Sequence, residues 1–261
     1  MILRHSRTRR LMAAFWVSVM IVGVLAEAYG VEGSLGRAEF EIGELIYENA
    51  LSSEEDIEDV VIESSEEGQP EITFENGRMR LESDVHFLFW FPDDFPDNIA
   101  VSWDFLPEVD DGLAMFWFCA KGREGEDLFD PALEERTGDY SEYNRGDINA
   151  YHISYFRRNP WDDPHINTVN LRKSYGHELV ALGPNPIPNI DSVKEHIEEP
   201  YRVQLIKSGP HIRMSINEMV VLEWKDEGEY WEDGKIGFRQ MANLAAEYAD
   251  LKIHEVIRLD E

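Results

Sequence analysis

The chain of 261 residues is poor in cysteine and in basic residues. Cys119 is the only cysteine, so no disulfide can form within the chain. It lies in the apolar run LAMFWFCA, which favours a buried structural thiol over a nucleophile. Lysines and arginines number 24 against 53 acidic residues, which gives a formal charge of −29. This balance argues against nucleic-acid binding, because phosphate contacts need a broad basic surface.

The chain also lacks the short motifs that mark several common chemistries. It has no P-loop, no dinucleotide fingerprint, no nucleophile elbow and no His/Cys zinc pattern, so we expect no metal and no cofactor. An E-x-D-x-E spacing occurs at 54–58, but it lies in an acidic, loop-like tract and we interpret it as coincidence. The segment GEDLFDP at 125–131 offers oxygen ligands without a calcium-loop spacing, so we expect turn and capping roles for its aspartates.

Only one apolar run is long, and it lies at the N-terminus. Four arginines within residues 4–10 precede the 16-residue run Leu11–Ala26, and AEA at 26–28 has the spacing of a cleavage site. We expect a signal peptide at 1–28, a single mature domain at 29–261, and a periplasmic or secreted location. The run is short for a spanning helix, so we expect no membrane span after processing; an uncleaved anchor is the alternative.

From Glu71 onward the sequence is a series of short strands separated by turns. Asn76-Gly77 is a hairpin signal. Apolar or alternating runs follow at 86–91, 100–107, 113–122, 149–158 and 166–174, three more strands are expected within 201–226, and GKIGFRQM (234–241) and LKIHEVIRL (251–259) come last. This pattern predicts an all-β sandwich of two antiparallel sheets. Short helices are expected only at 126–137 and 192–199, and the acidic tract 52–71 is expected to be a loop or an irregular early strand.

The segment from Gly125 to Pro188 has an unusual charge for this chain. Residues 145–177 contain five lysines and arginines against three aspartates, so their net charge is +2, which leaves −31 for the remainder. Tyrosines and histidines lie among these cations. A basic, aromatic-rich region on an acidic protein focuses anionic ligands on one place.

This segment, together with GKIGFRQM, resembles the YesU-like family of unknown function, from about Leu45 to Val256. The resemblance implies a concanavalin A-like jelly-roll sandwich, similar to glycan-binding lectins, laminin-G-like domains and several sugar-cleaving enzymes. It implies a carbohydrate context but no reaction, because this fold hosts lectins, hydrolases and lyases alike.

Strand alternation predicts which side chains of 149–158 share a face. Tyr155 and Arg157 would point one way, and His152 and Arg158 the other. His152 and Tyr155 are the acid/base candidates, since histidine titrates near neutrality and neighbouring arginines lower the pKa of a tyrosine. The alternatives are a half-buried structural tyrosine and a histidine that only forms hydrogen bonds.

The candidate ligand-binding residues are Arg145, Arg157, Arg158, Asn170, Arg172, Gln240 and Trp117. Arg157 or Arg158, together with Arg172, would clamp a carboxylate in fork geometry. Trp117 and Trp161 would stack on sugar rings or belong to the core. The alternative for the arginines is that they pair with the abundant acidic residues nearby.

We expect an exported, carbohydrate-active protein that acts as a lyase or hydrolase on an acidic, uronate-containing oligo- or polysaccharide. For β-elimination, Tyr155 or His152 would be the base, and Arg157, Asn170 and Gln240 would neutralise the carboxylate. The alternative is a non-catalytic glycan-binding module, and a third class is a structural envelope protein without a ligand. Convergence of base, arginine and amide on one point would distinguish the enzyme from the lectin.

Overall fold

Fifteen strands form nearly all of the regular structure in the residues that the computed structural model describes, which are 39–65, 68–158, 168–174, 178–187, 199–241 and 243–259. The same residues contain one 3-10 helix, η1 (Glu54–Ile57), and one α-helix, α1 (Tyr140–Arg145). They belong to one compact unit, Ala38–Glu261. The all-β prediction is confirmed. The predicted signal peptide with its predicted cleavage site, and residues 192–198 of the second predicted helix, lie outside the described residues.

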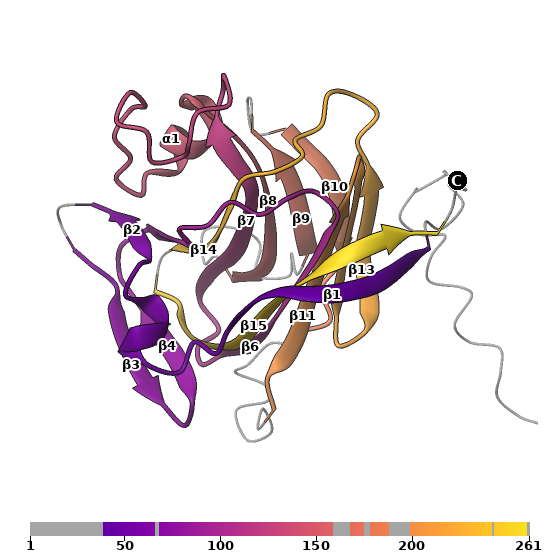
Figure 1. Cartoon of the computed structure of the whole chain (residues 1–261). Helices are drawn as coiled ribbons and strands as arrows, with labels where there is room; N and C mark the ends of the chain where they lie inside the picture. Colours follow the sequence, from indigo (N-terminus) through magenta and orange to yellow (C-terminus); the bar gives the residue numbers. More distant parts are fainter. Residues whose placement is uncertain are drawn as a thin grey trace, which may run out of the picture. The chain divides into compact units, whose positions relative to one another are not determined.

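The strands form two antiparallel sheets. The first contains β1 (Phe40–Asn49), β3 (Glu71–Glu75), β4 (Arg78–Glu82), β6 (Ile99–Pro107), β11 (Tyr201–Ser208), β12 (His211–Ile216), β13 (Met219–Lys225) and β15 (Ala245–Arg258). This eight-stranded sheet has the order β13-β12-β11-β6-β15-β4-β3, and β1 pairs with β15. Figure 1 shows β1, in indigo, running beside β15, in yellow.

The second sheet contains β2 (Val61–Ser64), β5 (Phe87–Trp90), β7 (Gly112–Gly122), β8 (Ile148–Arg158), β9 (Thr168–Lys173), β10 (Glu178–Pro184) and β14 (Lys235–Met241). Its order is β10-β9-β8-β7-β14-β5-β2. The region that the sequence marked as basic and aromatic therefore supplies three adjacent strands, β8 to β10, at one side of this seven-stranded sheet.

The main core lies between the two sheets and is rich in aromatic rings. Trp103 of β6 stacks on Phe116 of β7 with ring centroids 4.6 Å apart. Phe238 of β14 packs on Tyr248 of β15 at 4.8 Å. All four side chains are completely buried, and burial of such a side chain contributes about 2 kcal/mol to stability.

A second apolar cluster lies on the opposite face of the seven-stranded sheet, which we call the outer face. Trp90, Met115 and Trp117 project from the sheet there and pack against Leu128 and Tyr143. The latter two belong to the connection between β7 and β8, which also carries α1 (Figure 1). Part of the outer face is therefore a covered, apolar layer.

The helix predicted at 126–137 is wrong, because aspartates turn the chain there. Asp127 accepts a hydrogen bond from the amide of Phe129, and Asp130 accepts one from Ala132, both at 2.8 Å. Such side-chain bonds to the backbone compete with helix formation. Asp127 also pairs with Lys235 at 2.9 Å, so an ammonium group supplies the positive charge beside this carboxylate.

The first strands lie earlier in the chain than the sequence suggested. β1 was not predicted, because its side chains are mostly exposed and several are acidic, which hides its alternation. The acidic tract 52–71 contains η1 and β2, and the E-x-D-x-E spacing at 54–58 overlaps η1 rather than a strand of either sheet.

Candidate functional site

The strand register aligns one row of residues across the outer face. Arg172 on β9 is opposite His152 on β8, and His152 is opposite Trp117 on β7. The row continues through Gly237 on β14 to Trp90 on β5. A Cβ atom at Gly237 would lie 2.6 Å from Cε3 of Trp90, so glycine makes room for that indole. Directly opposite residues have neighbouring side chains, and the row therefore brings a guanidinium, an imidazole and an indole together.

His152 is held between Trp117 and Tyr140. Its imidazole stacks on the indole of Trp117 at 4.1 Å with an interplanar angle of 12°. Its Nε2 shares a hydrogen bond of 2.8 Å with the hydroxyl of Tyr140. His152 and Trp117 are completely buried, whereas Tyr140 is partly exposed. Trp117 therefore forms a platform under His152 and is not available to stack on a sugar.

Tyr140 reaches this position from the first turn of α1. Asp139 caps that helix by accepting a hydrogen bond of 2.7 Å from the amide of Ser141, and such a cap stabilises a helix by about 1 kcal/mol. The helix lies against β8. The position of the tyrosine hydroxyl over the sheet therefore depends on the β7–β8 connection.

The charges of three arginines act on the hydroxyl of Tyr140, and the guanidinium of one of them, Arg239, lies 5.6 Å from the Tyr140 ring centroid. Burial raises the pKa of Tyr140, and the positive charges of Arg172, Arg239 and Arg157 act in the opposite direction. Arg157 and Arg172 are partly exposed, and Arg239 is completely buried. We call the following six residues the outer-face cluster: Trp117, Tyr140, His152, Arg157, Arg172 and Arg239.

A bulge in β8 separates Tyr155 from this cluster. The pairing of β8 with β7 shifts between Phe156 and Ser154, so Tyr155 is an extra residue on its strand. Tyr155 faces the main core, packs edge-on against Trp103 at 5.4 Å and is completely buried. Burial raises its pKa well above the ordinary value. The structure thus places Tyr155 and Arg157 on different faces, contrary to the expected alternation, and Tyr155 is inaccessible as a base.

Three further candidates also lie apart from the cluster. Gln240 points into the main core, where its Nε2 donates to the hydroxyl of Tyr248 at 3.0 Å. Arg158 forms a buried ion pair with Asp110 at 2.7 Å, as the pairing alternative anticipated. Arg145 ends α1 with an exposed side chain.

Asn170 remains close to the cluster. It is opposite Ser154 on the outer face, two positions from Arg172 along β9, and its Oδ1 accepts a hydrogen bond of 2.9 Å from Thr168. Trp161 lies outside the described residues.

Tyr140 and Arg239 were not among the site residues predicted from the sequence. The alternation in KIGFRQM contained a signal for Arg239, because the apolar residues Ile236 and Phe238 share one face of the strand and Arg239 lies on the other. For Tyr140 the signal was Asp139 followed by Glu142, the spacing of a helix start.

A buried ion pair fixes the β7–β8 connection to the sheet. Arg136 lies 2.8 Å from the carboxylate of Glu63, and the indole of Trp90 donates to the same carboxylate at 2.8 Å. The side chains of Arg136 and Glu63 are 5% and 10% exposed. Breaking one half of such a pair leaves a buried charge without compensation, so the pair holds α1 in place.

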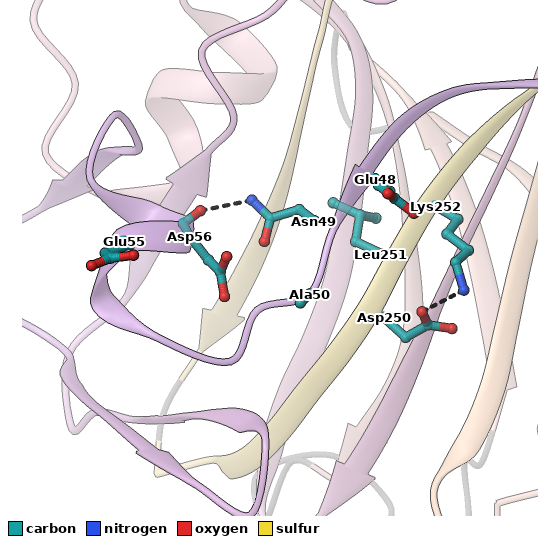
Figure 2. Close-up of a pocket in the computed structure, with 8 residues that line it drawn as sticks. All are labelled: Glu48, Asn49, Ala50, Glu55, Asp56, Asp250, Leu251 and Lys252. Carbon is teal, nitrogen blue, oxygen red and sulfur yellow. Dashed lines mark hydrogen bonds and ion pairs between the residues drawn. The ribbon is translucent and has the colours of Figure 1, made fainter.

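A separate pocket of about 550 Å³ lies beside β1, η1 and β15 (Figure 2). It is lined by Glu48, Asn49, Ala50, Glu55, Asp56, Asp250, Leu251 and Lys252. Asp56 accepts hydrogen bonds from the amides of Ser52 and Ser53, which lower its pKa despite partial burial. Asp250 pairs with Lys252 at 2.6 Å. These carboxylates stabilise the local turn and strand, and the pocket contains none of the cluster residues.

In the described part of the chain, no group of three or more His, Cys, Asp or Glu side chains is arranged to hold a metal ion. No helix among those residues is long and apolar enough to cross a membrane.

Comparison with known proteins identifies a family and a fold. Residues 44–253 match the model of a domain of unknown function, DUF1961. The uncharacterized protein YesU of Bacillus subtilis (strain 168) is 44% identical over 223 residues, which cover 83% of this chain and 98% of YesU. This match confirms the family resemblance seen in the sequence.

Solved structures confirm the jelly-roll sandwich. A protein of unknown function with a galectin-like fold from Bacillus subtilis aligns with a TM-score of 0.79 and 42% identity, over 85% of this chain and 100% of that one. The carbohydrate recognition domain of Emp46p in its potassium-bound form aligns with a TM-score of 0.55 and 13% identity, over 82% of this chain and 98% of that one. The second likeness concerns the fold alone.

Proposed function

The chain belongs to the DUF1961 family, and we propose that it binds a carbohydrate that carries carboxylate groups, at the outer-face cluster. The ligand class is suggested by the fold, which the carbohydrate recognition domain of Emp46p shares. The charge of the ligand is suggested by the cluster. The observation that carries the proposal is that Arg172, opposite His152 in the sheet, and Arg239, whose guanidinium lies 5.6 Å from the ring centroid of Tyr140, gather beside the hydrogen bond between Tyr140 and His152.

Arg157 and Arg172 are the residues we assign to the carboxylate. Both are partly exposed, and guanidinium groups match carboxylates through paired hydrogen bonds. The formal charge of the whole chain is −29, so a uronate-rich chain is repelled by most of the surface and attracted only where cations gather. Asn170 lies two positions before Arg172 on the outer face of β9, and its side chain is buried.

The test is a comparison of matched acidic and neutral oligosaccharides by thermal shift and calorimetry. We expect oligogalacturonides to bind and their methyl esters to bind weakly or not at all. Arg172→Ala should weaken binding, whereas Arg213→Ala, on β12 of the other sheet, should leave it unchanged. Equal binding of acids and esters would overturn the assigned charge, and binding to neither would overturn the proposal.

A second candidate function, a polysaccharide lyase, is favoured by the bond between Tyr140 and His152 at 2.8 Å. In β-elimination, a base removes the proton α to the uronate carboxyl group, and the electron pair is delocalised onto the carboxylate. The glycosidic oxygen at the β carbon then leaves with its bonding electrons and takes up a proton, which gives an unsaturated product without addition of water. In this scheme the partly exposed Tyr140 exchanges the proton with the sugar, the buried His152 shares it through their hydrogen bond, and the arginines neutralise the carboxylate.

A hydrolase is less well supported than a lyase. Glycoside hydrolysis uses two carboxyl groups about 5–10 Å apart, and the outer-face cluster contains none. The nearby carboxylate of Glu63 accepts hydrogen bonds from Arg136 and Trp90, which keeps it from acting as a free acid.

A further inference from the structure

Arg239 is a buried cation whose hydrogen bonds are incomplete. It lies on the outer face opposite Met115 and Leu88, and its side chain is completely buried. Its Nη2 donates to the carbonyl oxygen of Gly138 at 2.7 Å. Its Nε and Nη1 have no hydrogen-bond partner in the described part of the chain.

No described carboxylate balances this charge at ion-pair distance. Besides the carbonyl of Gly138, two aromatic rings lie against the guanidinium, with the ring centroids of Tyr143 and Tyr140 at 5.1 and 5.6 Å. Burial lowers the pKa of Arg239, but arginine stays protonated in proteins. A buried charge without an opposite charge destabilises a fold, and strongly perturbed buried groups cluster at functional sites.

The charge of Arg239 affects titratable groups that lie at the surface near α1. Burial lowers the pKa of His86, and the charge of Arg239 lowers it further; the same charge contributes to the low pKa of Asp139. His86 and Asp139 are both exposed. Tyr140, the partly exposed ring over Arg239, is the one bonded to His152.

We infer that Arg239 is a carboxylate-binding residue: the partly exposed ring of Tyr140, which covers its buried guanidinium, moves aside, and the uronate carboxylate of the ligand accepts hydrogen bonds from Nε and Nη1. This inference rests on the proposed function and goes one step further, because it assigns the innermost contact to a residue on β14 rather than to Arg157 or Arg172. The carboxylate then lies next to the bond between Tyr140 and His152. A neutral sugar has no group that balances the buried charge.

The test uses the thermal shift of the intact mature protein with D-galacturonate and with its methyl ester, which differ only in the carboxylate. The variants are Arg239→Met, which keeps the volume and removes the charge, and Arg239→Lys, which keeps the charge and removes the fork. We expect ligand-free Arg239→Met to melt at or above the wild-type temperature, because it removes an unbalanced buried charge. We expect the shift with galacturonate to disappear in Arg239→Met, and the affinity of Arg239→Lys to fall roughly thirtyfold.

The outcomes separate this inference from the proposed function. If galacturonate protects wild type and Arg239→Met equally, Arg239 does not bind the carboxylate, while the proposed function stands. If ligand-free Arg239→Met melts several degrees below wild type and Arg239→Lys binds normally, Arg239 has only a structural role. Protection by galactose 6-sulfate and not by galacturonate would overturn the carboxylate as ligand.

Acetate, which has the carboxylate without the sugar, completes the design. Galacturonate could leave the melting temperature of wild type unchanged while acetate raises it in wild type and not in Arg239→Met. In that case the inference stands and the proposed function is overturned. If neither ligand acts on wild type, both are overturned. Arg213→Met is the matched control, because it removes an arginine from the other sheet.

Discussion

Tyr140 and His152 are twelve residues apart in the chain and share a hydrogen bond of 2.8 Å above the ring of Trp117. The tyrosine comes from a short helix in a connection, and the histidine comes from the middle of a strand. Neither residue has this environment without the other element. The hydrogen bond therefore makes the surroundings of His152 on β8 depend on the position of the β7–β8 connection.

Tyr140→Phe tests whether this bond has a catalytic role. If the protein is a lyase, we expect turnover of a uronate polymer to be lost while binding persists, because a base acts in the transition state. Stability should fall by only about 1 kcal/mol, the usual contribution of one hydrogen bond. Turnover is followed by the ultraviolet absorbance of the unsaturated product.

Tyr155→Phe is the matched control, since it removes the same atom from the main core. It should leave binding and turnover unchanged. The opposite result, activity lost in Tyr155→Phe and kept in Tyr140→Phe, would contradict the assignment made from the structure. A chain that binds acidic sugars but releases no unsaturated product in any variant is a glycan-binding protein.

Binding of acidic sugars should depend on salt. Arg157 and Arg172 are partly exposed, so ions screen their attraction for a carboxylate, over about 10 Å at an ionic strength of 0.1 M. We expect the dissociation constant, measured by calorimetry, to rise with sodium chloride in wild type and to rise less steeply in Arg172→Ala. The same slope in both proteins would show that Arg172 does not contact the ligand.

The fold was readable from the sequence because strand alternation and turn residues are local signals. The face of the sheet on which Arg157 lies could not be predicted in this way, because it depends on the bulge at Tyr155. A single extra residue reverses the alternation of the side chains that follow it. Nothing local in NAYHISYFRR marks the bulge, which arises from pairing with β7. Arg158 was uncertain for a similar reason, since its partner Asp110 is 48 residues away along the chain.

Export remains a prediction from the N-terminal sequence. We expect cleavage after Ala28, so that the mature chain begins at Tyr29. Mass spectrometry of the protein from its native host measures this directly. Ala28→Tyr should slow processing, because the cleavage site requires a small residue. An intact Met1 in the membrane fraction would indicate an anchor instead.

Asp226 should make stability sensitive to acid. Burial opposes ionisation, but hydrogen bonds from Lys173 and Tyr151, both at 2.7 Å, lower the pKa of Asp226 below its ordinary value. A lowered pKa in the folded state gives stability that is present above the unfolded pKa, about 4, and is lost as pH falls through the folded value. Asp226→Asn should therefore be less stable than wild type at neutral pH. The difference, measured by urea unfolding, should shrink as the pH falls toward about 3; a constant difference would exclude this linkage.

The ion pair between Arg136 and Glu63 should couple stability to ligand binding. Both side chains are nearly buried, and removal of one partner from such a pair costs about 3–5 kcal/mol. Arg136→Met should lower the free energy of unfolding by this amount and, because it loosens the connection that positions Tyr140, should also weaken binding of acidic sugars.

The double variant Arg136→Met/Glu63→Leu should recover much of the stability, since apolar residues often replace a buried pair without loss. Arg213→Met breaks a more exposed pair with Glu223 and should cost at most about 1 kcal/mol. If Arg136→Met unfolds as readily as predicted yet its folded form binds sugar with wild-type affinity, the connection stabilises the sheet without positioning the site.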